Sequence, residues 1–241
     1  MRNILRYKTI HLSLLFVIIS TSVNAQVMPF GFFNSNTNTL PSLRDNTTLV
    51  VEMTSQTGKI WMDRNLGASQ VATSSADVNA FGDLYQWGRA TDGHQVRTST
   101  TTSTLSSSDS PGNGNFILAA NSPYDWRSPQ KNTLWQGING INNPCPDGYR
   151  IPTSAEWDAE TAAWTGGNNS AGAFSSSLKL PAAGGRRYTN GVTFDANTIG
   201  YYWTSTATGI VSDHLWFNST TLTKYNNGRG YGFSVRCIKN N

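Results

Sequence analysis

Few residues of this 241-residue chain are of types that could carry chemistry, and they are widely separated. After the first 25 residues the chain has two histidines, His94 and His214, and two cysteines, Cys145 and Cys237. Neither histidine stands at metal-ligand spacing from another ligand. We expect His94 to be a solvated turn residue and His214 to be a polar loop residue at the start of a strand. The sequence therefore predicts no catalytic residue and no cofactor, and we expect the protein not to be an enzyme.

Aspartate carboxylates of the chain could also serve as oxygen ligands for calcium. The Asp-x-Asp spacing of an EF-hand loop is absent, and the sequence leaves open whether calcium is bound. Asp63 is also expected to form an internal ion pair with its neighbour Arg64. The acidic residues that are candidate calcium ligands are Asp63, Asp83, Asp92 and Asp125.

The first 25 residues have the composition of a secretory signal peptide. Three basic residues precede an apolar run at 12–19, and small residues at 23–25 form a cleavage site, so the mature chain is expected to begin at Gln26. The alternative, a membrane anchor, is disfavoured because the apolar run is short. We therefore expect an exported protein that is periplasmic, extracellular or on the outer cell surface, with no transmembrane segment after cleavage.

Charge and size limit the function classes further. The signal segment carries three of the 18 basic residues, so 15 remain against 14 acidic ones and the mature net charge is about +1. Electrostatic attraction to nucleic acid has no support at this charge. The length suits one domain with a single core.

Export places both cysteines in an oxidising compartment, which favours a Cys145–Cys237 disulfide. It would close a loop of about 92 residues. The alternative, a metal or redox pair, is disfavoured because neither cysteine has a Cys-x-x-Cys partner or a nearby histidine.

The main helix has a clear start signal. Thr153 and Glu156 have the spacing of a capping box, in which each side chain bonds to the other residue's backbone N–H. The helix is expected to begin near Ser154 and to place Trp157 and Trp164 on one buried face.

Strands are expected on both sides of this helix. In the N-terminal half, runs at 49–53 and 59–62 predict a hairpin. The Ser- and Thr-rich stretch 98–110 is expected to be a mobile surface loop. Trp126 and Trp135 are expected to anchor a long irregular region.

In the C-terminal half, 178–181 predicts a short strand, and 200–206, 214–217 and 231–238 predict consecutive antiparallel strands. In the last of these, Phe233, Val235 and Cys237 would share one face and Ser234 and Arg236 the other. Arg186 and Arg187 are expected to be solvated.

The segment Gly148-Tyr-Arg-Ile-Pro-Thr-Ser-Ala-Glu-Trp157 resembles the Gly-Phe-Arg-Leu-Pro-Thr-Glu-Ala-Glu-Trp signature of the formylglycine-generating-enzyme and C-type-lectin-like superfamily. Six segments, in order, are similar to the bacterial family called Fibrobacter succinogenes major paralogous domain: 58–68, 82–89, 142–150, 178–184, 202–206 and 232–237.

This resemblance implies a single α+β domain of C-type-lectin-like fold over residues 49–241, preceded by a polar lead-in at 26–48. It implies antiparallel strands, one principal helix, long irregular loops and a final strand that returns beside the first. The chain lacks the Glu-Pro-Asn, Gln-Pro-Asp and Trp-Asn-Asp motifs of calcium-dependent lectins. It also lacks the close cysteine pair that holds copper in formylglycine-generating enzymes, so an oxidase of that type is the least favoured reading.

The favoured hypothesis is a non-catalytic module that binds a glycan or a protein through its long loops; the alternative is a structural envelope protein without a small ligand. A candidate surface precedes the final strand, where amides, a guanidinium and aromatic rings occur together. In the competing interpretation Trp216 belongs to the core and 225–229 is an Asn-Gly turn. The candidate ligand-binding residues are Trp216, Asn218, Tyr225, Asn226, Asn227 and Arg229. The alternative location for a site is the 98–135 loops.

Overall fold

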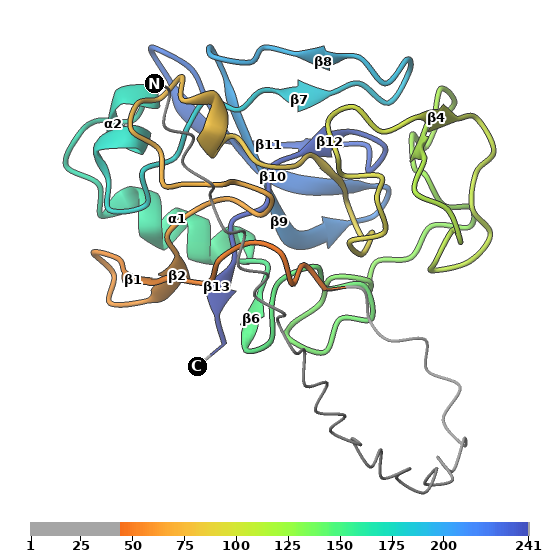
Figure 1. Cartoon of the computed structure of the whole chain (residues 1–241), viewed down its shortest axis with the longest axis horizontal. Coiled ribbons are helices and arrows are strands. Elements are labelled where there is room, and N and C mark those ends of the chain that lie inside the picture. The colour runs from red at the N-terminus through yellow and green to blue at the C-terminus, as the bar shows by residue number, and fades with distance from the viewer. Residues whose placement is uncertain (1–43, 241) are drawn as a thin grey trace, which may run out of the picture. The chain divides into compact units, whose positions relative to one another are not determined.

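The computed structural model describes residues 44–240, which all fall within one compact unit (Figure 1). The expected signal peptide and residues 26–43 lie outside the described part. The fold is α+β and mainly β, with short, mostly antiparallel strands and few helices. In chain order the described elements are β1 (Glu52–Thr54), β2 (Ile60–Met62), the 3-10 helix η1 (Val78–Ala80), β3 (Tyr85–Gln86), β4 (Thr101–Thr102), β5 (Phe116–Ile117), β6 (Tyr149–Arg150), α1 (Ser154–Ala162), α2 (Ser170–Ser175), β7 (Gly185–Arg186), β8 (Thr193–Phe194), β9 (Gly200–Thr208), β10 (Val211–Phe217), β11 (Leu222–Asn227), β12 (Gly232–Phe233) and β13 (Ile238–Lys239).

A four-stranded sheet in the order β1-β2-β13-β6 joins distant parts of the chain. The hairpin expected near the N-terminus is confirmed, since β1 and β2 pair antiparallel with Met53 opposite Trp61. Ile238 of β13 lies opposite Trp61 on one side and Arg150 on the other. The last described strand therefore lies between the first hairpin and β6.

The principal helix begins where the capping box predicts. Thr153 Oγ1 accepts from the Glu156 backbone N–H at 3.2 Å, and Glu156 Oε2 accepts from the Thr153 N–H at 2.8 Å. The helix ends at Ala162, earlier than expected, but Trp157 and Trp164 are both buried as predicted. Figure 1 shows α1 beside the strands β9 and β10, whose Tyr202 and Leu215 share a core with Trp157.

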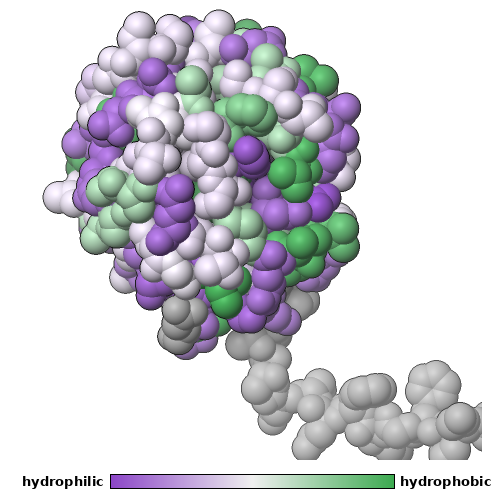
Figure 2. Space-filling model, turned by 90° about the vertical axis from the view of Figure 1, so that its left-hand side faces the viewer, coloured by the Kyte–Doolittle hydropathy of each residue, from purple (hydrophilic) through white to green (hydrophobic). Residues whose placement is uncertain are grey.

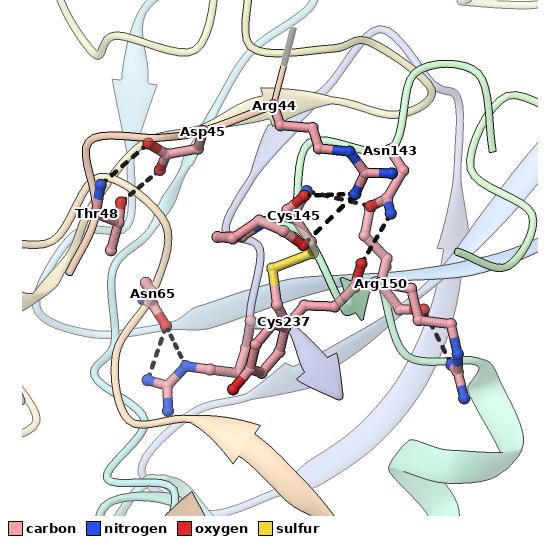
Figure 3. The surroundings of a disulfide bond; sticks show 12 residues. Arg44, Asp45, Thr48, Asn65, Asn143, Cys145, Arg150 and Cys237 are labelled. Carbon is pink, nitrogen blue, oxygen red and sulfur yellow. Dashed lines mark hydrogen bonds between the residues drawn. A yellow bond between two sulfur atoms is a disulfide. The ribbon is translucent and has the colours of Figure 1, made fainter. Parts of the chain in front are cut away.

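The Cys145–Cys237 disulfide is present, with the two Cα atoms 5.9 Å apart (Figure 3). Arg44 Nη1 donates to the Cys145 carbonyl at 2.9 Å, so the end of the polar lead-in is already bound to the domain. Asn143 Nδ2 donates to the Tyr149 carbonyl at 2.9 Å and ties the bridge to β6.

The long irregular region is anchored as predicted, because Trp126 and Trp135 are buried and bonded through their indoles. Trp126 Nε1 donates to the Trp87 carbonyl at 2.7 Å, and Trp135 Nε1 donates to the Asn142 carbonyl at 2.9 Å.

The expected strand over 231–238 is wrong, since two short strands in different sheets replace it. β12 pairs with β3 and β7, whereas β13 pairs with β2 and β6. Between them the buried Arg236 donates to Asn65 Oδ1 at 2.9 Å and to the Leu178 carbonyl at 2.7 Å. The residues expected on the two opposite faces of this strand, including Ser234, are all buried. The alternation of apolar and polar residues therefore does not distinguish a core face from a solvent face here.

Two further expectations about local structure need correction, and two are confirmed. The residues 178–181 form no strand. Asn226 and Asn227 lie in β11, which pairs with β10 as the third strand of a sheet ordered β11-β10-β9, so they do not form a turn. The predicted strands at 200–206 and 214–217 are confirmed as β9 and β10.

Three side chains that were expected to be solvated or in loops are buried: His94, His214 and Arg186. Arg186 donates to the Ser99 carbonyl at 2.6 Å, to the Gly191 carbonyl at 2.7 Å and lies over the Phe116 ring. Ser99 and Phe116 come from distant segments of the chain, so their contacts with Arg186 could not be predicted from the local sequence. Its neighbour Arg187 is exposed, as expected.

No helix within the described residues is long and apolar enough to cross a membrane. On the side of the domain that faces left in Figure 1, hydrophobic residues occur in small groups between hydrophilic ones (Figure 2).

Candidate functional site

Seven aromatic side chains form a continuous line across two sheets and a loop, which we call the aromatic row. Neighbouring ring centroids are 5.0 Å apart for Tyr124 and Tyr188, 4.6 Å for Tyr188 and Tyr231, and 6.0 Å for Tyr231 and Phe194. The row continues from Phe194 to Tyr201 at 5.4 Å. Its members in spatial order are Tyr124, Tyr188, Tyr231, Phe194, Tyr201, Trp216 and Tyr225.

The pairing of β9, β10 and β11 fixes the far end of the row. Tyr201 lies directly opposite Trp216, and His214 lies opposite Tyr225. Directly opposed residues of antiparallel strands project to the same face, so these side chains lie together. Trp216 and Tyr225 meet edge to face with centroids 5.6 Å apart.

The row combines rigidity with access to solvent. Tyr225 is 54% exposed and Tyr124 is 39% exposed, while Tyr188, Phe194 and Trp216 are half-buried. Half-buried rings are held by the core on one side and keep an edge or face available on the other.

His214 forms the floor beneath this end of the row. Its ring lies 4.9 Å from the Phe233 ring and 6.0 Å from the Tyr201 ring, centroid to centroid. Its Nδ1 has no hydrogen-bond partner among the described residues. Burial lowers the pKa of His214 to about 3, so the floor is uncharged at neutral pH.

Polar groups border the row. Asp195 Oδ2 accepts from the Tyr201 hydroxyl at 2.7 Å. Burial first, and then this bond to Asp195, raise the pKa of Tyr201, so its hydroxyl stays protonated at neutral pH. The exposed Arg187 guanidinium lies 4.4 Å from the centre of the Phe194 ring. A donor and an acceptor thus flank the middle of the row.

The structure brings some of the sequence-predicted site residues together and separates others. Trp216 and Tyr225 share one face and belong to the row. Arg229 is buried instead: its Nη2 donates to Asn132 Oδ1 at 2.7 Å and its guanidinium lies 4.7 Å from the Trp87 ring centre. Its role in the folded chain is to hold the irregular region against the core.

The three asparagines lie at opposite ends of the β10–β11 hairpin. Asn218 Oδ1 accepts from the backbone N–H groups of Thr220 and Thr221, both at 2.9 Å, and so closes the turn after β10. Asn226 and Asn227 lie at the other end of β11, opposite Asp213 and Ser212 of β10. Asn226 is exposed there.

His94 and Asp92 form a pair that resembles part of a catalytic triad, but its geometry is structural. His94 Nδ1 faces Asp92 Oδ1 at 2.5 Å, and His94 Nε2 accepts from the Gln86 backbone N–H at 3.0 Å. Both ring nitrogens are therefore occupied within the fold. Burial, together with the charge of Arg89, lowers the pKa of His94 to about 4.

The two buried histidines predict acid sensitivity. In the unfolded chain their pKa is about 6.5, whereas folded His94 and His214 have pKa values of about 4 and about 3. Below pH about 6.5 the unfolded chain therefore binds more protons, so stability falls as pH falls. Urea unfolding between pH 7 and pH 5 should show a loss of up to about 1.4 kcal/mol per pH unit for each histidine. His214→Gln should remove about half of this slope, and an unchanged slope would contradict the assignment.

The candidate calcium ligands do not form a cluster. Asp63 is paired with Arg64 at 2.7 Å, as expected, and Asp92 is paired with Arg89 at 2.6 Å. Within the described part of the chain no three His, Cys, Asp or Glu side chains lie close enough to hold a metal ion.

Comparison with models of known protein families, with curated proteins and with solved structures finds no match for this chain. The candidate site therefore rests on the geometry of the aromatic row.

Proposed function

We propose that this protein is an exported, non-catalytic module of C-type-lectin-like fold that binds carbohydrate chains along the aromatic row. The fold proposal is supported by the capping box after β6, by the long irregular region and by β13 lying beside the first hairpin. It also agrees with the family resemblance of the sequence. Export is supported by the signal-like first residues and by the disulfide.

The observation that carries the binding proposal is the line of aromatic rings, four of which lie in strands and all of which except Tyr201 are at least partly exposed. Aromatic faces contact the apolar C–H faces of sugars, and a few placed polar groups then select hydroxyls. Arg187 can donate and Asp195 can accept in this way. Because strands already hold four of the rings, little conformational entropy is lost there when a ligand binds.

The electrostatics favour a neutral sugar chain. The expected mature charge is about +1 and the floor at His214 is neutral, so no strong field selects an anionic polymer. The flat rings, with one acceptor at Asp195 and one donor at Arg187, suit neutral polysaccharides.

The test is a glycan array probed with the mature protein, followed by affinity measurements on the neutral glycans that bind. The variant Trp216→Ala with Tyr225→Ala should lose affinity by about fivefold to a hundredfold, since each of the two aromatic contacts contributes about 0.5–1.5 kcal/mol. Phe174→Ala is the matched control, because Phe174 is a half-buried ring in α2 outside the row.

Retained affinity in the folded double variant would place binding away from the row. Failure of the wild type to bind any glycan would instead favour a structural envelope protein.

A further inference from the structure

Strand β11 leaves an edge of six residues open, and no described residue pairs with that edge. β9, at the other side of the same sheet, is covered: Trp203 N–H donates to the Ser234 carbonyl at 3.0 Å and Ser205 N–H donates to the Pro152 carbonyl at 2.8 Å. Exposed edges are commonly shortened, bulged or blocked by proline, because they otherwise pair with other strands. β11 pairs with β10 in unbroken register and contains no proline, so its outer edge is free to pair.

The turn before β11 shows which backbone groups face outward. The Asn218 N–H donates to the Thr221 carbonyl at 2.9 Å, so these two residues form a hydrogen-bonded pair. Such pairs alternate with non-hydrogen-bonded pairs along an antiparallel ladder. In this ladder Tyr225 is bonded to β10, whereas the N–H and C=O groups of Lys224 and Asn226 point away from it. Backbone donors and acceptors therefore lie along the open edge.

The side chains of β11 suit pairing with another β11 strand about a two-fold axis. An axis at Tyr225 places this ring opposite its own counterpart, and it places Lys224 opposite Asn226 of the second copy. Lys224 and Asn226 then exchange backbone hydrogen bonds, and the opposed aromatic rings stabilise the pair. An axis at Lys224 would instead set two ammonium groups opposite each other, which is destabilising.

Charge complementarity favours the register centred on Tyr225. Asp213 lies opposite Asn226 on β10 and has no salt-bridge partner among the described residues. In the two-fold pair, Lys224 of the second copy lies on the other side of Asn226 and on the same face. The Cα atoms of Asp213 and this lysine are then about 10 Å apart, or two strand spacings, which their side chains span together. Lys224 Nζ uses two of its three donors within its own copy, on Ser154 Oγ at 2.9 Å and on Asp158 Oδ2 at 2.5 Å, and keeps one for this contact.

A hollow of about 470 Å³ beside β11 offers a place for a side chain of the second copy. It lies between α1 and the β10–β11 hairpin, where Leu222 contributes apolar wall and Asp158 and Thr161 contribute polar groups. Asn226 of the second copy lies opposite Lys224 in this register and projects to the same face. Its amide can donate to Asp158 and accept from Thr161, so the hollow supplies partners for it.

We propose that β11 pairs antiparallel with β11 of a second copy of this chain about a two-fold axis at Tyr225. The two three-stranded sheets then form one continuous sheet across the axis. The pairing does not depend on carbohydrate binding. It sets the aromatic rows of the two copies end to end, because Tyr225 is the last ring of each row.

The test is cross-linking through an introduced thiol. The chain has only Cys145 and Cys237, which are bonded to each other, so Tyr225→Cys supplies the single free thiol. At the axis the two introduced Cα atoms would be about 4.5 Å apart, within the range of a disulfide. Thr223→Cys is the matched control, because it changes the same face of the same strand but its two Cα atoms would be about 14 Å apart.

Mild oxidation should convert Tyr225→Cys into a covalent dimer and leave Thr223→Cys monomeric, as measured by intact mass under non-reducing conditions. Sedimentation of the wild type should show a dimer in exchange with the monomer. Asn226→Pro should weaken this dimer by about fivefold to a hundredfold, because each dimer loses two outward N–H donors while the β10 side of the strand is unchanged.

A wild type that sediments as a monomer at every concentration would overturn the inference. Equal cross-linking of the two cysteine variants, or a dimer that Asn226→Pro leaves unchanged, would overturn it as well, because the contact would then lie elsewhere. If circular dichroism shows that Asn226→Pro is unfolded, the two cysteine variants decide the question. Glycan binding does not enter any of these measurements, so this inference and the proposed function are tested separately.

Discussion

Exchange of Cys145 and Cys237 for alanine is expected to lower the free energy of unfolding by about 4 kcal/mol. The bridge spans 92 residues, and a cross-link over a loop of that length strongly restricts the unfolded chain. Both cysteines are fully buried, and alanine avoids placing a hydroxyl in their apolar surroundings.

The measurement is urea unfolding of the double variant and of the wild type, with and without a reductant. The reduced wild type and the double variant should lose stability by similar amounts, because both lack the bridge. A double variant as stable as the oxidised wild type would show that the cross-link contributes little, and free thiols in the non-reduced protein would show that it is absent.

Arg236→Met is expected to cost about 3 kcal/mol or more, because it leaves buried acceptors without donors. The Arg236 side chain is almost fully buried and donates to Asn65 Oδ1, to the Leu178 carbonyl and to the Met62 carbonyl. Burial lowers the pKa of Arg236 to about 10. This value is still well above 7, so the guanidinium remains protonated at neutral pH. Methionine fills much of the volume but supplies no N–H group.

Arg150→Met is the matched control. Arg150 makes a partly exposed ion pair with Glu156 at 2.6 Å, and such pairs contribute about 1 kcal/mol or less. Urea unfolding of both variants should show the larger loss at Arg236. Equal losses would mean that the buried acceptors find new partners.

The elements predicted well from sequence depend on neighbours in the chain. The capping box of Thr153 and Glu156 needs only residues three apart, and the β1–β2 hairpin needs only a short turn. The disulfide followed from cysteine count and expected export.

The wrong predictions concern groups whose partners are distant in sequence. His94 follows an Asp-Gly turn, and Arg186 precedes a second arginine, so both looked solvated. In the fold, His94 is buried with its ring bonded to the Gln86 backbone N–H, and Arg186 is buried with its guanidinium bonded to the Ser99 carbonyl. The splitting of 231–238 likewise depends on Asn65, which receives Arg236 from far along the chain.

Only part of the aromatic row could be predicted from the sequence, because most of its rings come from segments that are distant in the chain. Trp216 and Tyr225 lie in neighbouring strands, and both were predicted to belong to one candidate surface. Tyr124, Tyr188 and Phe194 come from separate segments, and nothing local distinguishes a row ring from a core ring. Tyr124 and Tyr188 meet where both pack closely against Gly230, a residue distant from each in the chain.

The position of β13 between β2 and β6 has a consequence for biosynthesis. This sheet joins residues 60–62, 149–150 and 238–239, so its middle strand is the last of the three to leave the ribosome. Until then β2 and β6 lack their common partner, and long-range pairings of this kind form slowly. The nascent chain is therefore expected to remain without the complete β1-β2-β13-β6 sheet until residue 239 has emerged, and under the proposed export it would still be open for transport across a membrane.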